Sequence, residues 1–222
     1  MDSAVESVSY KVLNANGAEV GKVTLDADVF GVKIQANLVH QTVRWQRAKA
    51  RSGTHSCLSK GMIEGGNRKP FKQKGTGRAR SGSNTSPLWV GGAKSHGPHP
   101  RDYEFRLSKR TRRQALASVL TDKVNKSTLI ILDELKIGKG RTKEVLAVLK
   151  NLGVDKKKLA LVLPEREEMV WRGAGNLANV LTLPAQAVNV YDLLKFQYLI
   201  CTKDSVKAIE SKVNKEKAQE AK

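Results

Sequence analysis

The chain has 222 residues and carries 40 lysines and arginines against 21 aspartates and glutamates, a formal net charge of +19 at pH 7. This length suffices for one domain with a sizeable core. Cys57 and Cys201 are far apart and in no C-x-x-C spacing, which disfavours a disulfide scaffold and a zinc site. The acidic N-terminus lacks a signal-peptide pattern, and the longest apolar runs are far below the roughly 20 residues of a membrane span. We therefore expect a soluble, cytoplasmic protein.

The N-terminal part of the chain predicts a hairpin followed by a helix. Tyr10–Leu13 and Val20–Leu25 are β-compatible runs separated by NANG, a turn signal. Asp26 or Asp28 is suited to cap the next element. From Lys33 to Arg51, apolar residues recur at helical intervals. A basic stripe occupies another face of this helix and consists of His40, Arg44, Arg47 and Arg51. The stripe suits either a solvated face or phosphate contacts, and its place beside further positive charge favours the second.

The positive charge is concentrated in the next part of the chain. Eighteen lysines and arginines against three acids fall between Arg44 and Arg113, a net +15 of the total +19. The centre of this stretch, Gly65–Pro87, is rich in glycine and basic residues and has no apolar period that would bury a face. We predict a single domain over residues 1–222 with a long extended loop, 51–106, inserted in it. Such a loop is expected to be disordered alone and ordered on a polyanion.

A second basic cluster opens the helix predicted for Lys109–Lys123. Ser108 is its expected N-cap, and Leu116 and Leu120 are expected to be buried. Its first turns carry Lys109, Arg110, Arg112 and Arg113. Cations at a helix N-terminus oppose the macrodipole, and bound phosphate would reverse that unfavourable arrangement.

The remainder of the chain alternates between strands and helices. The predicted strands are Thr128–Leu132, Leu159–Leu163, Val180–Leu183 and Tyr198–Thr202. The predicted helices between them are Thr142–Leu152, Glu167–Gly173 and Val190–Leu194. A last helix, capped by Asp204 or Ser205, leads into a polar tail over 212–222. This alternation predicts an α/β fold, a Rossmann-like body with a mostly parallel sheet and helices packed around it.

Neither a cofactor nor a metal site is predicted. GTGRAR at 75–80 lacks the strand, the helix and the third glycine of a nucleotide-binding loop. His96 and His99 have no further metal ligands nearby in sequence. No catalytic residue is proposed, so we expect a protein that is not an enzyme. Trp89 and Phe71, surrounded by arginine, lysine and glycine, suit stacking on an RNA base or insertion into an RNA crevice.

Several strings of the basic region together resemble the bacterial form of the universal large-subunit ribosomal protein four family. They are RKPFKQKGTGRARSGS at 68–83, SP at 86–87, GG at 91–92, GPHPRDY at 97–103 and RRQAL at 112–116. One departure is Phe71, where bacterial relatives more often have tryptophan; phenylalanine keeps the ring but lacks the N–H donor.

This resemblance implies a structural constituent of the large ribosomal subunit that binds large-subunit ribosomal RNA and acts in early subunit assembly. It also implies that the loop lines the peptide exit tunnel near its constriction, beside the extended loop of another ribosomal protein. Some members repress their own operon. The positions matching the tunnel-proximal tip are Arg68, Lys69, Phe71, Lys72 and Lys74. No membrane and no small-molecule substrate are implied.

The residues that we predict to contact RNA are those of the basic region and its flanking helices. They are Arg44, Arg47, Lys49, Arg51, Arg68, Lys69, Lys72, Lys74, Arg78, Arg80, Trp89, Arg101, Arg106, Lys109, Arg110, Arg112 and Arg113. Two other interpretations stay open. A nucleotide-using α/β enzyme predicts saturable binding of a mononucleotide, and a generic nucleic-acid condenser predicts equal affinity for DNA and RNA.

Overall fold

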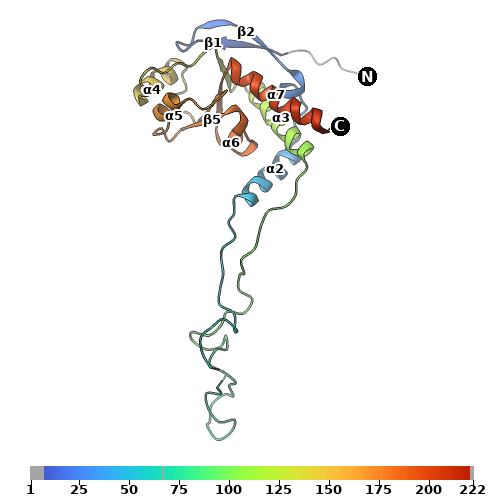
Figure 1. Ribbon diagram of the computed structural model, residues 1–222, viewed down its shortest axis with the longest axis vertical. Helices are drawn as coiled ribbons and strands as arrows, with labels where there is room; N and C mark the ends of the chain where they lie inside the picture. Colours follow the sequence, from blue (N-terminus) through green and yellow to red (C-terminus); the bar gives the residue numbers. More distant parts are fainter. Residues whose placement is uncertain (1–7, 67, 221–222) are drawn as a thin grey trace. The chain divides into compact units, whose positions relative to one another are not determined.

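The computed structural model describes residues 8–66 and 68–220 (Figure 1). The chain divides into two compact units. The first, here called the body, comprises the described residues up to Arg47 and from Arg106 onward. The second, here called the loop unit, comprises Ala48–Phe105. The predicted loop 51–106 therefore falls almost entirely within the loop unit.

A six-stranded sheet forms the centre of the body. Its strands are β1 (Val8–Leu13), β2 (Glu19–Leu25), β3 (Leu129–Leu132), β4 (Leu159–Leu163), β5 (Val180–Pro184) and β6 (Tyr198–Thr202). Their order across the sheet is β2-β1-β3-β6-β4-β5. Only the β1/β2 pair is antiparallel among these neighbours; β1 pairs parallel with β3, and the remaining pairs are parallel as well. The predicted fold class, an α/β body with a mostly parallel sheet, is confirmed.

The antiparallel edge is the predicted N-terminal hairpin. Tyr10 of β1 lies opposite Val23 of β2. In the turn, the Asn14 side chain accepts hydrogen bonds from the backbone N–H groups of Asn16 at 3.0 Å and Ala18 at 2.9 Å. Gly17 has a φ of +83°, a conformation that favours glycine. Asn14 and Gly17 thus supply the chemistry that the tight connection needs.

Seven α-helices and one short 3-10 helix accompany the sheet in the described residues. They are α1 (Ala27–Phe30), α2 (Ala36–Lys49), α3 (Lys109–Asn125), α4 (Thr142–Asn151), α5 (Glu168–Ala174), η1 (Ala185–Ala187), α6 (Val190–Lys195) and α7 (Lys203–Glu220). Ser108 caps α3 as predicted, because its Oγ accepts from the Thr111 N–H at 3.1 Å.

The last helix departs from the prediction at both ends. Thr202, not Asp204 or Ser205, lies before its first residue, and Thr202 Oγ1 accepts from the Ser205 N–H at 3.3 Å. At the other end α7 continues to Glu220, so residues 212–220, predicted as the polar tail into which the helix frays, are helical. The physical reason is that lysine, glutamate, alanine and glutamine are strong helix formers even without an apolar face.

The core lies on both faces of the sheet. Neighbouring residues of one strand belong to different apolar clusters: Ile131 packs in the cluster that contains Leu120 of α3, and Leu132 in the cluster that contains Leu149 of α4. Figure 1 shows α3 and α7 on one side of the strands and α4 and α5 on the other. This two-sided burial explains why the central strands are continuous apolar runs.

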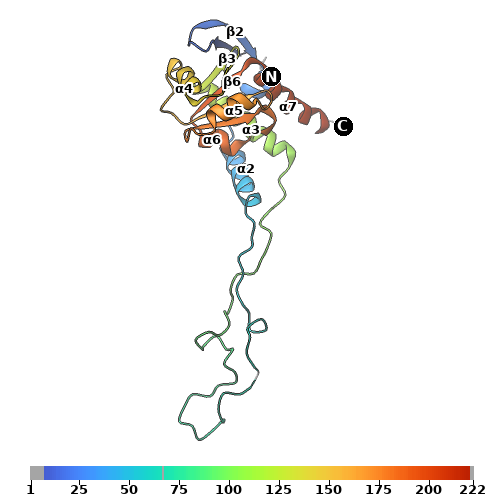
Figure 2. The same cartoon turned by 60° about the vertical axis from the view of Figure 1, so that its left-hand side comes forward.

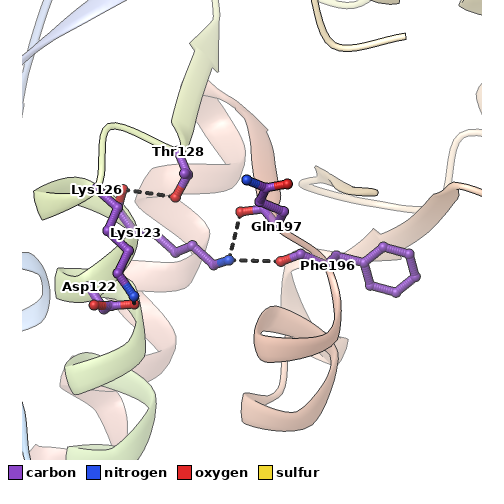
Figure 3. Close-up of polar contacts among 6 residues, drawn as sticks. All are labelled: Asp122, Lys123, Lys126, Thr128, Phe196 and Gln197. Atoms are coloured by element: carbon purple, nitrogen blue, oxygen red, sulfur yellow. Dashed lines mark hydrogen bonds and ion pairs between the residues drawn. The ribbon is translucent and has the colours of Figure 1, made fainter. Parts of the chain in front are cut away.

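A buried lysine joins α3 to the start of β6. The Nζ of Lys123 donates to the backbone oxygen of Phe196 at 2.7 Å and to that of Gln197 at 2.8 Å (Figure 3). Burial lowers the pKa of Lys123 below its ordinary value. The lysine therefore has a structural task, which is to tie α3 to the segment between α6 and β6 through two carbonyl groups.

Across the described segments, no helix combines the length and the apolar character that spanning a bilayer requires.

Candidate nucleic-acid interface

Most of the predicted contact residues have side chains that a ligand can reach. All of those predicted from Arg44 through Arg110 are exposed, and only Arg112 and Arg113 are half-buried. Within the loop unit, every predicted lysine and arginine of the tip is exposed: Arg68, Lys69, Lys72 and Lys74. Phe71, the aromatic residue of the tip, is half-buried. Surface cations of this kind are suited to contacts with phosphate groups.

The start of α3 presents its cations in two layers. Lys109 and Arg110 are exposed, whereas Arg112 and Arg113 are half-buried against the body. The first turn of α3 contains no acidic residue. Each cation there opposes the helix macrodipole at a cost of about 0.3–1 kcal/mol, so a bound anion would be favourable at this end of α3.

The loop unit consists of two segments that run antiparallel and contact each other. The Arg101 N–H donates to the Gly53 oxygen at 3.2 Å, and the Cys57 N–H donates to the Pro98 oxygen at 3.2 Å. Further along, the Lys94 N–H donates to the Leu58 oxygen at 3.1 Å. Figures 1 and 2 show the outgoing and returning segments lying side by side here. After Lys49, none of the described residues of this unit belongs to a helix or a strand.

A ring with two cations lies where the two segments meet. The guanidinium carbon of Arg51 is 3.7 Å from the centroid of the Tyr103 ring, and that of Arg101 is 4.3 Å from the same centroid. The Tyr103 hydroxyl and His55 Nε2 are 3.0 Å apart, within hydrogen-bond distance. Arg51 and Arg101 were both predicted as RNA contacts, but the role of Tyr103 was missed. Its position in GPHPRDY, between basic residues, is the only signal in the sequence.

One predicted contact residue has an acidic partner. Lys49 Nζ lies 3.3 Å from Glu104 Oε1, and both side chains are exposed. An exposed pair of this kind is worth at most about 1 kcal/mol, because water and salt screen it. A phosphate group can therefore compete with Glu104 for Lys49 at little cost.

The loop unit also has a small interior, which its composition did not predict. Ser83, Thr85 and Ala93 are buried, and the Ala93 N–H donates to the Thr85 oxygen at 3.1 Å. Trp89 donates from Nε1 to Ser81 Oγ at 3.1 Å, while 41% of the residue stays exposed. The sequence predicted that Gly65–Pro87 has no apolar period to bury a face, and it gave no sign of this interior. Small polar side chains fill the interior instead of an apolar face.

Exposed apolar residues flank Trp89. Leu88 is 95% exposed and Val90 is fully exposed. Apolar and aromatic side chains at the surface of a basic segment suit insertion between RNA bases. The Trp89 N–H is already hydrogen-bonded within the loop unit. That the Trp89 ring stacks on an RNA base stays a prediction.

The glycines of the loop unit serve two different purposes. At Gly53, with a φ of +61°, an added Cβ would lie 1.9 Å from the carbonyl oxygen of Arg101. Glycine is needed here because the backbone of the returning segment passes close to the backbone of the outgoing one. At Gly75 and Gly77 the φ values are +80° and +64°, and no heavy atom lies within 4 Å of such a Cβ. These two positions combine a glycine conformation with open space for a ligand.

No metal centre emerges from the described part of the chain, where no group of three or more histidines, cysteines, aspartates or glutamates is close enough to hold an ion. His96 and His99 are both exposed.

Fold and surface together define a class: an α/β protein whose exposed cations are concentrated on an inserted loop unit and the adjoining helices. The family model of the ribosomal protein L4/L1 family matches residues 23–212. The chain belongs to this family.

Its similarity to individual members extends over nearly the whole chain. A protein of Alkaliphilus oremlandii is 47% identical over 199 residues, which cover 90% of this chain and 96% of that protein. A protein of Oceanobacillus iheyensis is 45% identical and covers 87% of this chain and 93% of its own. A third, of Pelotomaculum thermopropionicum, is 44% identical, with 89% and 95% covered. All three are named large ribosomal subunit protein uL4, and none of these names is that of an enzyme.

Proposed function

We propose that the chain is a structural constituent of the large ribosomal subunit and binds large-subunit ribosomal RNA through the loop unit and the start of α3. The observation that carries this proposal is the similarity, over about nine-tenths of the chain, to proteins named for that subunit. The exposure of the loop cations supports it, because phosphate contacts dominate the affinity of proteins for nucleic acid.

Recognition in this proposal depends on the shape of the RNA more than on its base edges. The loop unit offers cations on an irregular backbone with open glycine positions at 75 and 77. Such a surface suits phosphates that a folded RNA brings close together, and beyond Lys49 the described residues of this unit offer no helix or strand that could enter a groove.

The finer parts of the proposal follow from membership of the family. The loop would line the peptide exit tunnel near its constriction, with a tip formed by Arg68, Lys69, Phe71, Lys72 and Lys74. Other large-subunit proteins would be its neighbours, including the second protein whose loop reaches the tunnel. A role in early subunit assembly and repression of its own operon belong to the same proposal.

A competition experiment tests the proposal against its two rivals. The purified chain is bound to a folded fragment of large-subunit ribosomal RNA, and unstructured DNA is added at equal phosphate concentration. We expect the RNA to stay bound. Displacement by DNA would favour a generic nucleic-acid condenser and contradict the proposal.

The enzyme alternative is tested in the same assay by adding ATP or GTP. Our proposal predicts no saturable binding of either mononucleotide at micromolar concentration. Saturable binding that competes with the RNA fragment would instead favour a nucleotide-using α/β protein.

A further inference from the structure

Two apolar side chains of the loop unit stand out by their exposure. Leu88 is 95% exposed and Val90 is fully exposed, whereas Met62, the next most exposed large apolar residue in the described chain, is 64% exposed. Leu88 and Val90 are separated only by Trp89. Single exposed apolar residues are common on soluble proteins, but neighbouring ones mark surfaces that make contacts. The pair is therefore a candidate contact surface.

Hydrogen bonds fix the backbone around this pair. The Trp89 N–H donates to the Ser86 oxygen at 3.0 Å, which closes one turn, and the Gly92 N–H donates to the Trp89 oxygen at 2.9 Å, which closes a second. The indole is held as well, because Trp89 Nε1 donates to Ser81 Oγ at 3.1 Å. The two turns share Trp89, so the loop unit's own contacts order this segment.

The sequence supplies the residues that these two turns require. Pro87 is the second residue of the first turn, where its fixed φ is favoured. Gly91 is the third residue of the second turn and has a φ of +78°, a conformation that favours glycine. Leu88 and Val90 are the remaining central residues of the turns, and both project into solvent. The turns thus present the two side chains side by side along the chain.

The segment that carries the pair is neutral, although the loop unit is strongly basic. Residues 81–93 contain no charged side chain, and the exposed cations Arg80 and Lys94 stand at the two ends of this stretch. Phosphate contacts dominate the affinity of proteins for RNA, and a neutral segment offers none. Unpaired bases stack on aromatic rings and arginine planes, whereas Leu88 and Val90 have no such face. Their chemistry therefore fits a protein surface better than an RNA strand.

The charges beside the pair indicate what kind of protein surface fits. No aspartate or glutamate occurs between Glu64 and Asp102, so the charges nearest to the pair in sequence are those of Arg80 and Lys94. Acidic side chains around an apolar pocket would complement these cations. A turn that is already ordered also loses little conformational freedom on docking, which favours binding.

We propose that Leu88 and Val90 dock into an apolar pocket of a second protein, and that the rim of this pocket carries acidic side chains. The inference deepens the proposed function, on which it rests, because it assigns one segment of the loop unit to a neighbouring protein instead of to RNA. Trp89 is a positioning residue, since both turns are closed through its backbone.

A photoreactive side chain at position 88 tests which molecule lies there. The full chain with Leu88 replaced by p-benzoylphenylalanine is produced in cells, the cells are irradiated, and the crosslinked product is analysed with and without ribonuclease. We expect a product with a second protein that ribonuclease leaves unchanged. Mass spectrometry should locate the crosslink among aliphatic residues with aspartate or glutamate nearby. The control carries the photoreactive side chain in place of Arg78, which the proposed function places against RNA.

The protein identified in this way is then purified, and its affinity for the full chain is measured. Val90→Ser is expected to weaken binding roughly tenfold, because it removes half of the apolar pair at a position without packing of its own. Lys94→Glu should weaken binding several-fold at low salt, since it places a negative charge beside the acidic rim. Lys94→Arg, which keeps the charge, is its matched control and should bind like the wild type.

Two glycine variants test whether the fixed turns matter. An added Cβ at Gly92 would lie 1.9 Å from the Ser86 oxygen, so Gly92→Ala should disrupt the turns and weaken binding although both apolar side chains remain. At Gly82 no heavy atom lies within 4 Å of such a Cβ, and Gly82→Ala should bind like the wild type. Wild-type affinity in Gly92→Ala would contradict docking through a fixed turn.

The outcomes separate this proposal from the broader one. If RNA is crosslinked at position 88 as well as at position 78, the docking assignment is overturned and the proposed function stands. A crosslink to a second copy of the chain, no crosslink at position 88, or wild-type affinity in Val90→Ser would overturn the assignment too. A lack of RNA crosslinks at position 78 would count against the proposed function, whatever molecule position 88 contacts.

Discussion

The guanidinium carbon of Arg51 lies 3.7 Å from the centroid of the Tyr103 ring, so a cation of the outgoing segment of the loop unit contacts an aromatic residue of the returning one. Arg101 approaches the same ring at 4.3 Å. A cation at an aromatic face gains about 0.5–1 kcal/mol at an exposed site. Two such contacts offset part of the repulsion between the arginines and bring both charges to the place where the segments meet. The ring thus preorganises two predicted phosphate contacts.

Removing this ring should loosen the two segments in the unbound protein. In Tyr103→Leu, trypsin is expected to cleave after Arg51 and Arg101 several times faster, because a loss of about 1–2 kcal/mol in local stability raises the open population. Tyr103→Phe keeps the ring and loses only the hydroxyl contact with His55, so it should be cleaved at close to the wild-type rate. Mass spectrometry of timed digests identifies the sites. Equal rates in Tyr103→Leu and the wild type would show that the ring does not hold the segments.

Gly53 should tolerate no side chain. A Cβ there would lie 1.9 Å from the Arg101 carbonyl oxygen, and the φ of +61° is itself unfavourable for other residues. We expect Gly53→Ala to break the bond from the Arg101 N–H to the Gly53 oxygen and to speed hydrogen exchange of the Arg101 amide at least tenfold. Gly61→Ala is the control, since no heavy atom lies within 4 Å of its added Cβ. Unchanged exchange in Gly53→Ala would refute the pairing.

Lys123 should contribute to the stability of the body despite its charge. Lys123→Met removes the donor that serves the carbonyl groups of Phe196 and Gln197, and leaving such groups unsatisfied is worth about 1–3 kcal/mol. We expect the free energy of unfolding in urea to fall by that amount. Lys126→Met, which removes only an exposed pair with Asp122, should change it by less than about 0.5 kcal/mol. Similar values for both variants would mean that the buried contacts add no net stability.

Glu210 should destabilise the body at neutral pH. Burial raises the pKa of Glu210. The hydrogen bond from the Asp26 N–H, at 3.0 Å, acts in the opposite direction and lowers the pKa, whereas the nearby Asp26 carboxylate raises it further. A carboxyl whose folded pKa exceeds its unfolded pKa stabilises the fold below the unfolded pKa, and this stability is lost as pH rises through the folded pKa.

Glu210→Gln is therefore expected to raise the melting temperature at pH 7 by a few degrees at most, for a gain of no more than about 1 kcal/mol. The gain should disappear near pH 3.5, where Glu210 is protonated in both states. Glu64→Gln, at an exposed side chain, is the control. A Gln variant that melts lower than the wild type at pH 7 would show that the charged form is favoured by the fold.

Much of the body is predictable because its elements depend on local chemistry. The buried strand Leu159–Leu163 is an uninterrupted apolar run, and β4 has those same bounds. Ser108 is a capping residue before a helical pattern, and it caps α3. The NANG stretch that contains Asn14 and Gly17 is a turn signal, and the hairpin forms around these residues.

Contacts between distant segments were not predictable in the same way. Arg51 meets Tyr103 only because the returning segment of the loop unit passes beside the outgoing one, and no periodicity records that path. A cavity lined by Trp45, Arg112 and Lys212 likewise forms only because α2, α3 and α7 come together, and these three residues share no signal in the sequence. Composition alone showed which part of the chain carries the positive charge. Tertiary packing decides which of these cations contact an aromatic ring and which line a cavity.

The salt dependence of RNA binding tests the central claim most directly. The affinity for a folded large-subunit ribosomal RNA fragment is measured between 50 mM and 300 mM potassium chloride for three proteins. The first is the wild type. The loop variant replaces six cations by glutamine, at Arg68, Lys69, Lys72, Lys74, Arg78 and Arg80. The control variant removes the same charge from exposed lysines of the body, at Lys139, Lys143, Lys150, Lys156, Lys157 and Lys158.

Each phosphate contact contributes about 0.7–0.9 to the slope of log affinity against log salt, so six lost contacts should flatten it by about 4–5. We predict that flattening for the loop variant and a slope near the wild-type value for the control. Equal slopes for the two variants would contradict the account. The cations of the loop unit would then affect RNA binding only through the net charge of the protein and not through contacts with phosphate groups.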